Sequence, residues 1–199
     1  LRVYILFMGE YGSAAPWSES SVKGCKRFLE RVAALTDMIS DEPIGKELET
    51  KLHQTIKKVT NDIEEMKFNT AIASLMALIN DIYAVGKLDK DSVSIIIRLL
   101  CPFAPHVCEE MWETIGGEGY ASLASWPEYD EAKTVNDTIE IGVQVNGKLR
   151  STILIPNGAD KDVVLDIAKN DDKIKYATDG KTVVKEIYVP NKIVNIVVK

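Results

Sequence analysis

The sequence predicts an α+β protein in which an α-helix bundle is followed by a small β-β-α-β-β domain. Along residues 18–116, apolar residues recur at the three-to-four spacing of amphipathic helices. Beyond residue 138, short runs rich in Val and Ile take their place, and such β-branched runs are typical of strands. Because the hydrophobic period changes at one point in the chain, we expect two folding units rather than one continuous core.

Five amphipathic segments make up the predicted bundle. Ser18 is a suitable N-cap for the first. The third is expected to end near Gly86, since glycine suits a helix C-terminus. The fourth starts at either Asp89 or Asp91, and the fifth starts at Pro105, because proline loses no hydrogen bond in a first helical turn. The apolar stripes of the five segments lie at 22–35, 48–63, 68–83, 93–100 and 105–115.

The predicted boundaries follow from composition. We expect the helix bundle at residues 1–116, a linker at 117–137 and the α/β domain at 138–199. The linker assignment depends on GGEGYASLASWPEYDEA, which is rich in Gly, Ser and Ala and contains a Pro. In the last domain, Asn-Gly between the first two strand-like runs is a strong hairpin signal. One or two short helices are expected between the second and third runs.

Charge is unevenly distributed along the chain. The net charge of −6 at pH 7 argues against a protein that coats nucleic acid nonspecifically. Residues 1–137 hold 14 Lys and Arg against 22 Asp and Glu, a net −8, whereas residues 138–199 hold 10 against 8, a net +2. The α/β domain is therefore the better surface for a polyanion.

Neither a membrane span nor a disulfide framework is expected. No apolar run approaches the roughly 20 residues that a transmembrane helix needs, so no membrane partner is predicted. Cys25, Cys101 and Cys108 show no CxxC spacing and are predicted to be free buried thiols in a reducing cytoplasm. The opening LRVYILFMG is too short for a typical signal-peptide core, and we expect it to belong to a longer cytoplasmic protein.

The stretch CPFAPHVCEEMWE, residues 101–113, has the composition of a metal site. A helix turns about 100° per residue, which places Cys108 on the apolar side and Glu109 and Glu110 on the opposite side. A thiol and carboxylates on opposite sides of one helix cannot share an ion. We therefore predict a helix start with a His106–Glu110 pair, and no metal, cofactor or catalytic residue.

Five stretches resemble the leucyl family of class I aminoacyl-tRNA synthetases, and the resemblance runs from residue 1 to residue 199. They are LLCPFAPHVCEEMWE at 99–113, PWSESSVKGCKRFLERV at 16–32, FNTAIASLM at 68–76, VQVNGKLR at 143–150 and IYVPNKIVNIVV at 187–198. The first three are similar to the anticodon-binding helix bundle of that class. The last two are similar to the C-terminal α/β domain of the bacterial leucyl type.

The resemblance implies a function. The chain would be the tRNA-binding C-terminal portion of a leucyl-tRNA synthetase, and the parent would be a leucine–tRNA ligase that uses ATP and magnesium. HIGH-like and KMSKS-like signatures do not occur in the sequence. This portion is thus expected to hold leucine tRNA while the catalytic and editing domains of the parent act. The alternatives are the corresponding part of a valyl- or isoleucyl-type synthetase and a standalone helical protein-interaction module.

The candidate tRNA contacts are mostly basic residues near turns and aromatic side chains. They are Asn146, Lys148, Arg150, Lys173, Lys175, Lys185 and Lys192 in the α/β domain and Lys26 and Arg27 in the bundle. Lys148 and Arg150 are two residues apart and share a face if the strand is regular. For Asn146 the alternative is turn chemistry alone. For the basic residues it is a solvated surface or surface ion pairs, and ion pairs are favoured for Arg31.

Overall fold

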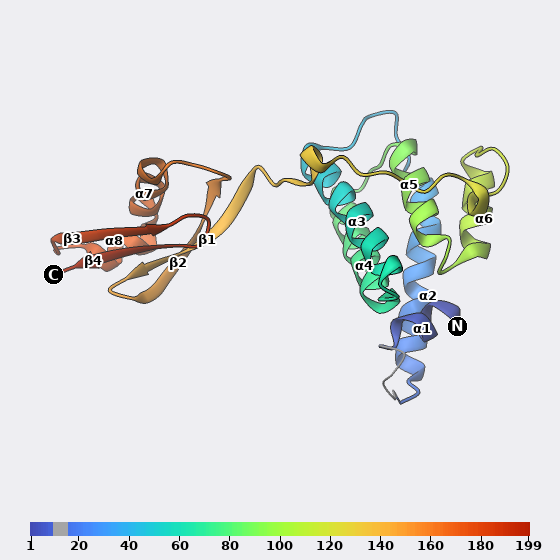
Figure 1. Cartoon of the computed structure of the whole chain (residues 1–199), viewed down its shortest axis with the longest axis horizontal. Helices are drawn as coiled ribbons and strands as arrows, with labels where there is room; N and C mark the ends of the chain where they lie inside the picture. The colour runs from blue at the N-terminus through green and yellow to red at the C-terminus, as the bar shows by residue number, and fades with distance from the viewer. Residues whose placement is uncertain (10–15) are drawn as a thin grey trace. The chain divides into compact units, whose positions relative to one another are not determined.

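The computed structural model describes residues 1–9 and 16–199 and divides into two units, Leu1–Val135 and Asn136–Lys199 (Figure 1). The first unit is helical and the second is built on a sheet, which confirms the predicted α+β class. Each unit encloses its own hydrophobic core, so each is described by itself.

The first unit contains the predicted amphipathic helices and a short helix before them. Its elements, with η for a 3-10 helix, are α1 (Arg2–Phe7), α2 (Glu19–Ala33), η1 (Ala34–Met38), α3 (Lys46–Glu64), α4 (Phe68–Val85), α5 (Lys90–Leu100), α6 (Pro105–Thr114), η2 (Ala121–Leu123) and η3 (Glu131–Thr134). The Ser18 hydroxyl caps α2, and Gly86 ends α4 at φ 83°. Asp89, rather than Asp91, caps α5 by accepting the N–H of Ser92 at 2.7 Å.

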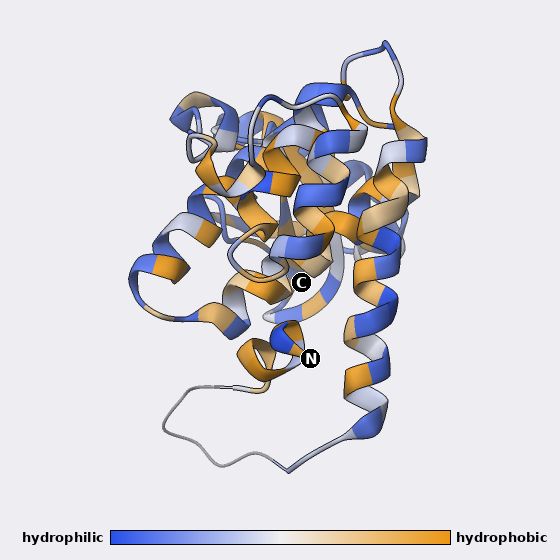
Figure 2. Cartoon of the chain, turned by 90° about the vertical axis from the view of Figure 1, so that its right-hand side faces the viewer, coloured by the Kyte–Doolittle hydropathy of each residue, from blue (hydrophilic) through white to orange (hydrophobic). Residues whose placement is uncertain are grey.

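The apolar stripes of these helices meet in one core. In Figure 2 the ribbons alternate between hydrophilic and hydrophobic bands, as amphipathic helices do. Leu35, Ile56, Leu75 and Ile97 come from four different elements and are each at most 1 % exposed. Helix α4 is long and apolar enough to span a membrane by length and composition alone, whereas no such segment is predicted from the sequence. Its buried residues contribute to this core.

Residues 117–135, here called the strap, pack along the bundle instead of forming a free linker. In Figure 1 the strap runs from α6 past α5 toward α3. Trp126 Nε1 donates to Thr60 Oγ1 at 2.8 Å, and Arg98 Nη1 donates to the carbonyl of Ser125 at 3.0 Å. Small polar residues resemble a linker in composition, but these contacts with distant helices hold them on the bundle.

The end of the strap is held on α3 by polar contacts. The three contacts are Lys57–Glu131 at 2.6 Å, Lys133–Glu49 at 2.6 Å and the N–H of Asp130 donating to His53 Nδ1 at 3.1 Å. The first unit therefore extends to Val135. This corrects both the predicted boundary at residue 116 and the predicted linker at 117–137.

The second unit is a four-stranded sheet with two helices. Its elements are β1 (Thr138–Val145), β2 (Lys148–Pro156), α7 (Lys161–Asn170), α8 (Asp172–Thr178), β3 (Val183–Val189) and β4 (Ile193–Val198). The strand order is β2-β1-β4-β3, in which β1 and β4 are parallel and the two outer pairs are antiparallel. The predicted β-β-α-β-β order is present, with two helices in the central position.

The two faces of this sheet differ in burial. Val143 and Val194 point from the sheet into the core with Val164 of α7, and all three are 0 % exposed. On the opposite face, Leu149 is 61 % exposed and lies over Gly142. A Cβ at Gly142 would stand 2.9 Å from Leu149 Cδ1, so the strand tolerates only glycine there without a shift of Leu149.

Candidate nucleic-acid interface

The hairpin between β1 and β2 is fastened to β4 by a side-chain amide. Asn146 and Gly147 have φ of 49° and 77°, the left-handed values of a two-residue hairpin turn. Asn146 Oδ1 accepts the N–H of Val198 at 2.9 Å, and Asn146 Nδ2 donates to the Val198 carbonyl at 3.1 Å. Both polar atoms of the Asn146 side chain are therefore engaged within the unit, which favours the turn alternative for this residue.

A β-bulge follows the turn. Val143 pairs with Ser151, but the next residue, Gln144, pairs with Leu149, so Arg150 is an extra residue in β2. Lys148 and Arg150 are expected to share a face only if the strand is regular. The strand is not regular at this point, so the simple alternation does not apply to this pair.

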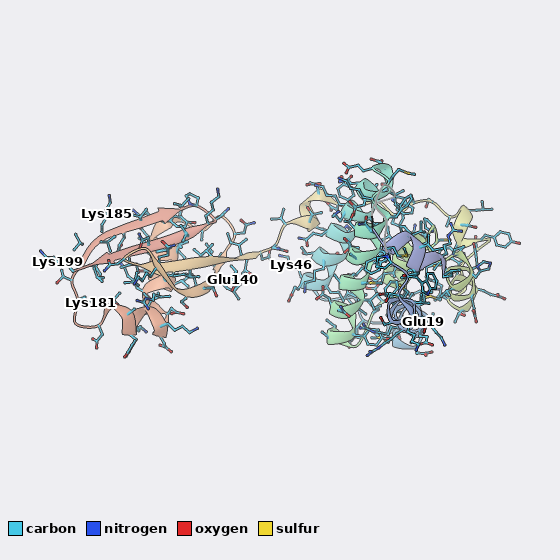
Figure 3. All side chains as sticks on the ribbon, turned by 90° about the horizontal axis from the view of Figure 1, so that it is seen from below. Glu19, Lys46, Glu140, Lys181, Lys185 and Lys199 are labelled. Carbon is cyan, nitrogen blue, oxygen red and sulfur yellow. The ribbon has the colours of Figure 1, made fainter. Side chains whose placement is uncertain are left out.

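Several lysines gather at the hairpin end of the sheet. Lys148 pairs with Val145, Val145 pairs with Ile196, and the neighbouring Val197 pairs with Lys185 across β3. This register sets Lys148 level with Glu186, which pairs with Ile196, and places Lys185 one residue further along β3. Figure 3 shows Lys181, Lys185 and Lys199 at this end of the unit, with Glu140 toward the other end. We call Lys148, Arg150, Lys181, Lys185 and Lys199 the basic end.

The residues of the basic end are exposed, and within the described part of the chain none of them makes an ion pair with a carboxylate. The ion pair that the second unit does contain, Lys169–Glu186 at 2.7 Å, involves a lysine of α7. An exposed cation without a carboxylate partner keeps its full attraction for a phosphate. The basic end therefore has the electrostatic character of a polyanion-binding surface.

Other predicted contacts lie elsewhere in the second unit. Lys192 lies in the turn before β4, at the end of that strand remote from Val198. Lys173 and Lys175 lie on α8, with exposed side chains. The structure thus separates the seven predicted residues of this domain into the hairpin end, the opposite turn and a helix.

In the first unit, the predicted contacts lie on α2. Lys26 forms an exposed i,i+4 pair with Glu30 at 3.6 Å, which contributes little to stability. Arg27 is exposed and borders a hollow between α2 and α4. The ion pair favoured for Arg31 is not found among residues 1–9 and 16–199: its guanidinium donates to Asn80 Oδ1 at 2.7 Å and lies 4.3 Å from the ring centroid of Tyr83.

The Cys- and Glu-rich stretch is the start of α6. Cys108 is 0 % exposed in the core, as predicted, and burial raises the pKa of its thiol. Glu109 accepts the N–H groups of Ala121 and Ser122 at 2.7 and 3.0 Å, and the Ser122 side chain and these N–H groups lower its pKa. Glu109 thus holds η2 in place through its carboxylate. Among the described residues, no cluster of His, Cys, Asp and Glu suits a metal ion.

Sequence reasoning missed two functional candidates. Arg2 and Arg98 are far apart in the sequence, but both border one hollow on the first unit. A signal existed for Arg98, since a charged residue interrupts the apolar run SIIIRLL. No comparable signal marked Arg2, because only the fold brings α1 beside the turn after α5.

The chain thus combines a helix bundle that carries a packed strap with a small sheet domain that has a basic end. The family model for the anticodon-binding domain of tRNA ligases matches residues 45–165, which is more than half of the chain. The chain therefore belongs to this family.

Relatives narrow the type within the family. A leucine–tRNA ligase of Alkaliphilus oremlandii is 47 % identical over 200 residues, and one of Chlorobium phaeobacteroides is 36 % identical over 206 residues. Both alignments cover 100 % of this chain, which spans about a quarter of the length of these relatives (25 % and 26 %).

A solved structure agrees with this assignment. The ternary complex of Agrobacterium radiobacter K84 agnB2 LeuRS with tRNA and LeuAMS matches with a TM-score of 0.79 and 30 % identity, over 100 % of this chain and 28 % of that one. The predicted resemblance to the C-terminal region of a leucyl-tRNA synthetase is confirmed.

Proposed function

We propose that the chain is the tRNA-holding C-terminal portion of a leucine–tRNA ligase, and that it positions leucine tRNA for ATP-dependent aminoacylation. The observation that carries this proposal is the match of the whole chain to leucine–tRNA ligases, together with a structural relative solved with tRNA. ATP and magnesium would be bound by the catalytic domain of the parent, and editing would take place in a further domain. The parent would act in the cytoplasm.

The basic end of the second unit is the primary contact in this proposal. Lys148, Arg150 and Lys185 offer exposed cations near the hairpin end of the sheet, and tRNA is recognised largely through its backbone and shape. Asn146 would act indirectly, by fixing the turn that presents Lys148. Lys173, Lys175 and Lys192, with Lys26 and Arg27 of α2, are secondary candidates.

Direct binding tests the proposal. The 199-residue chain is titrated with leucine tRNA and with a tRNA that has a short variable arm, at low and moderate salt. We expect tighter binding of leucine tRNA. Lys148→Ala and Arg150→Ala should each weaken it about tenfold and reduce the slope of log K against log salt by about one.

Two controls interpret the result. Lys169→Ala removes a lysine of the same unit that is already paired with Glu186, so its effect on tRNA affinity should be small. A folded chain that binds neither tRNA at low salt would contradict the proposal and favour a protein-interaction module. Lys192→Ala reports whether the opposite turn contributes.

A further inference from the structure

A hollow of about 380 Å³ on the first unit brings together two arginines from separate helices. Arg2 belongs to α1 and Arg98 to α5, and the strap borders the hollow with Ser122, Ala124 and Trp126. The volume lies within the range of about 300–1,000 Å³ that small-ligand sites have in proteins. Its position is separate from the basic end, which belongs to the second unit.

Backbone carbonyls orient both guanidinium groups without neutralising them. Arg2 Nη2 donates to the carbonyl of Pro102 at 2.8 Å. Arg98 Nε donates to the carbonyl of Ser94 at 3.2 Å, and its Nη1 donates to that of Ser125 at 3.0 Å. Within residues 1–9 and 16–199, neither guanidinium forms an ion pair with a carboxylate. Each therefore retains charge and N–H groups for an anion.

The carboxylates nearby do not serve as the anion for Arg2 and Arg98. Both oxygens of Glu109 accept N–H groups from Ala121 and Ser122. Burial lowers the pKa of Arg98, and the nearby Asp91 carboxylate raises it by a smaller amount. A partly buried guanidinium without a paired carboxylate gains more from a bound anion than an exposed one does.

A planar side chain stands beside the two cations. The Trp126 indole N–H donates to Thr60, which fixes the ring, and the side chain is 37 % exposed. Pro102, Pro105 and Ala124 supply apolar walls. A fixed aromatic ring next to paired arginines is the combination that binds a nucleotide, because the base or sugar packs on the ring while the phosphate meets the cations.

We propose that this hollow binds one phosphodiester of an RNA chain between Arg2 and Arg98, with the adjoining nucleoside against Trp126. The inference rests on the proposed function and adds to it a phosphate contact on the helix bundle. Free phosphate presents the same chemistry, and the experiment separates the two sources.

Arginine variants test the site on the 199-residue chain. Arg2→Gln keeps a donor for the Pro102 carbonyl but removes the charge, and Arg98→Lys keeps the charge but removes the fork of N–H groups. The matched control is Lys87→Gln, because Lys87 precedes α5 at its other end and is already paired with Glu42. Unfolding midpoints identify any variant that fails to fold, and Arg2→Gln carries the test if Arg98→Lys fails.

The readouts are affinity for leucine tRNA and the NMR signal of the Trp126 indole N–H during titration with AMP and with inorganic phosphate. We expect each arginine variant to weaken tRNA binding about tenfold, with a salt slope reduced by about one for Arg2→Gln, and Lys87→Gln to leave both nearly unchanged. AMP should shift the Trp126 signal in the wild type and not in Arg2→Gln.

The outcomes separate the two proposals. Normal tRNA affinity in both arginine variants overturns this inference and leaves the proposed function standing. An arginine-dependent shift with inorganic phosphate, combined with unchanged tRNA affinity, also overturns it, since that marks a site for free phosphate. Failure of the wild type to bind tRNA at low salt is a failure of the proposed function itself.

Discussion

The first unit and the second unit use their charged side chains differently. In the first unit, at least seven lysines are paired with carboxylates of the same unit. In the second unit, the lysines of the basic end have no such partner among the described residues, and Lys169 is the paired exception. An external polyanion should therefore bind more favourably at the basic end, because it need not displace an internal carboxylate there.

Truncation of a core side chain in the first unit has the largest expected effect. Leu75→Ala should lower the free energy of unfolding of that unit by about 2–5 kcal/mol, since it leaves a cavity among helices. All three tryptophans lie in the first unit, so tryptophan fluorescence during urea unfolding measures it alone. The control is Leu123→Ala, where the side chain is 81 % exposed and the change should stay within about 0.5 kcal/mol.

Leu75→Ala also tests the independence of the two units. Hydrogen exchange of the β1 and β4 amides reports on the second unit. If these amides lose protection in parallel with the fluorescence change, the units do not unfold separately, and the comparison between them would have to be abandoned.

Removal of the Asn146 amide should have the next largest effect on stability. Asn146→Ala removes two hydrogen bonds to Val198 and places alanine at φ 49°, so the second unit should lose about 2–3 kcal/mol. Asn191→Ala is the matched control: it has φ 56° but no side-chain bond of this kind among the described contacts. Hydrogen exchange of the Val198 N–H measures the effect of each substitution. Equal effects would mean that backbone strain alone, and not the lost hydrogen bonds, causes the destabilisation.

Substitution in the strap should have an intermediate effect. A Cβ at Gly117 would stand 2.3 Å from Trp112 Cε2, so Gly117→Ala must displace the indole and should cost about 1–3 kcal/mol. Gly119→Ala adds a Cβ in open space at φ 66° and should cost less. A shift of the tryptophan emission in Gly117→Ala alone identifies displacement of Trp112. No shift in either variant would show that the strap can move without disturbing the bundle.

The smallest expected effect is on pH dependence. Burial and the nearby Lys133 lower the pKa of His53 below its ordinary 6.5, and Nδ1 accepts the Asp130 N–H only when it carries no proton. The unfolded chain therefore binds more protons, so this contribution to stability is complete above pH 6.5 and is lost as pH falls. The loss should be about 1 kcal/mol or less, the net contribution of one hydrogen bond.

The comparison of wild type with His53→Gln isolates this effect. The urea midpoint, followed by tryptophan fluorescence, should decrease from pH 7.5 to pH 5.5. This decrease should be larger for the wild type than for the variant. Equal decreases would mean that other groups govern the pH response of the strap.

Local signals in the sequence predicted most of the fold. Ser18, Gly86 and Pro105 act within a single turn of chain, so residue type alone placed the helix ends near them. The Gly- and Ser-rich strap was misjudged because Trp126 and Asp130 are held by Thr60 and His53, more than 60 residues away. Such contacts leave no periodic pattern.

The candidate interface was predicted less completely than the fold. The Asn-Gly signal located the hairpin tip, but it could not show that the Asn146 amide is used by Val198. Nor could it show the bulge that makes Arg150 an extra residue in β2. Charge and proximity in sequence identify candidate basic residues, whereas strand order decides which of them are neighbours.

The strand order of the second unit has a consequence for how it forms. Strand β4 is the last in sequence, yet it lies between β1 and β3 and pairs with both. Its pairing with β1 joins residues about 50 positions apart, such as Gly142 and Ile193, and closing a loop of that length costs entropy before any contact repays it. During synthesis, β3 lacks its partner strand until residues 193–198 are made, so the sheet cannot be complete before then.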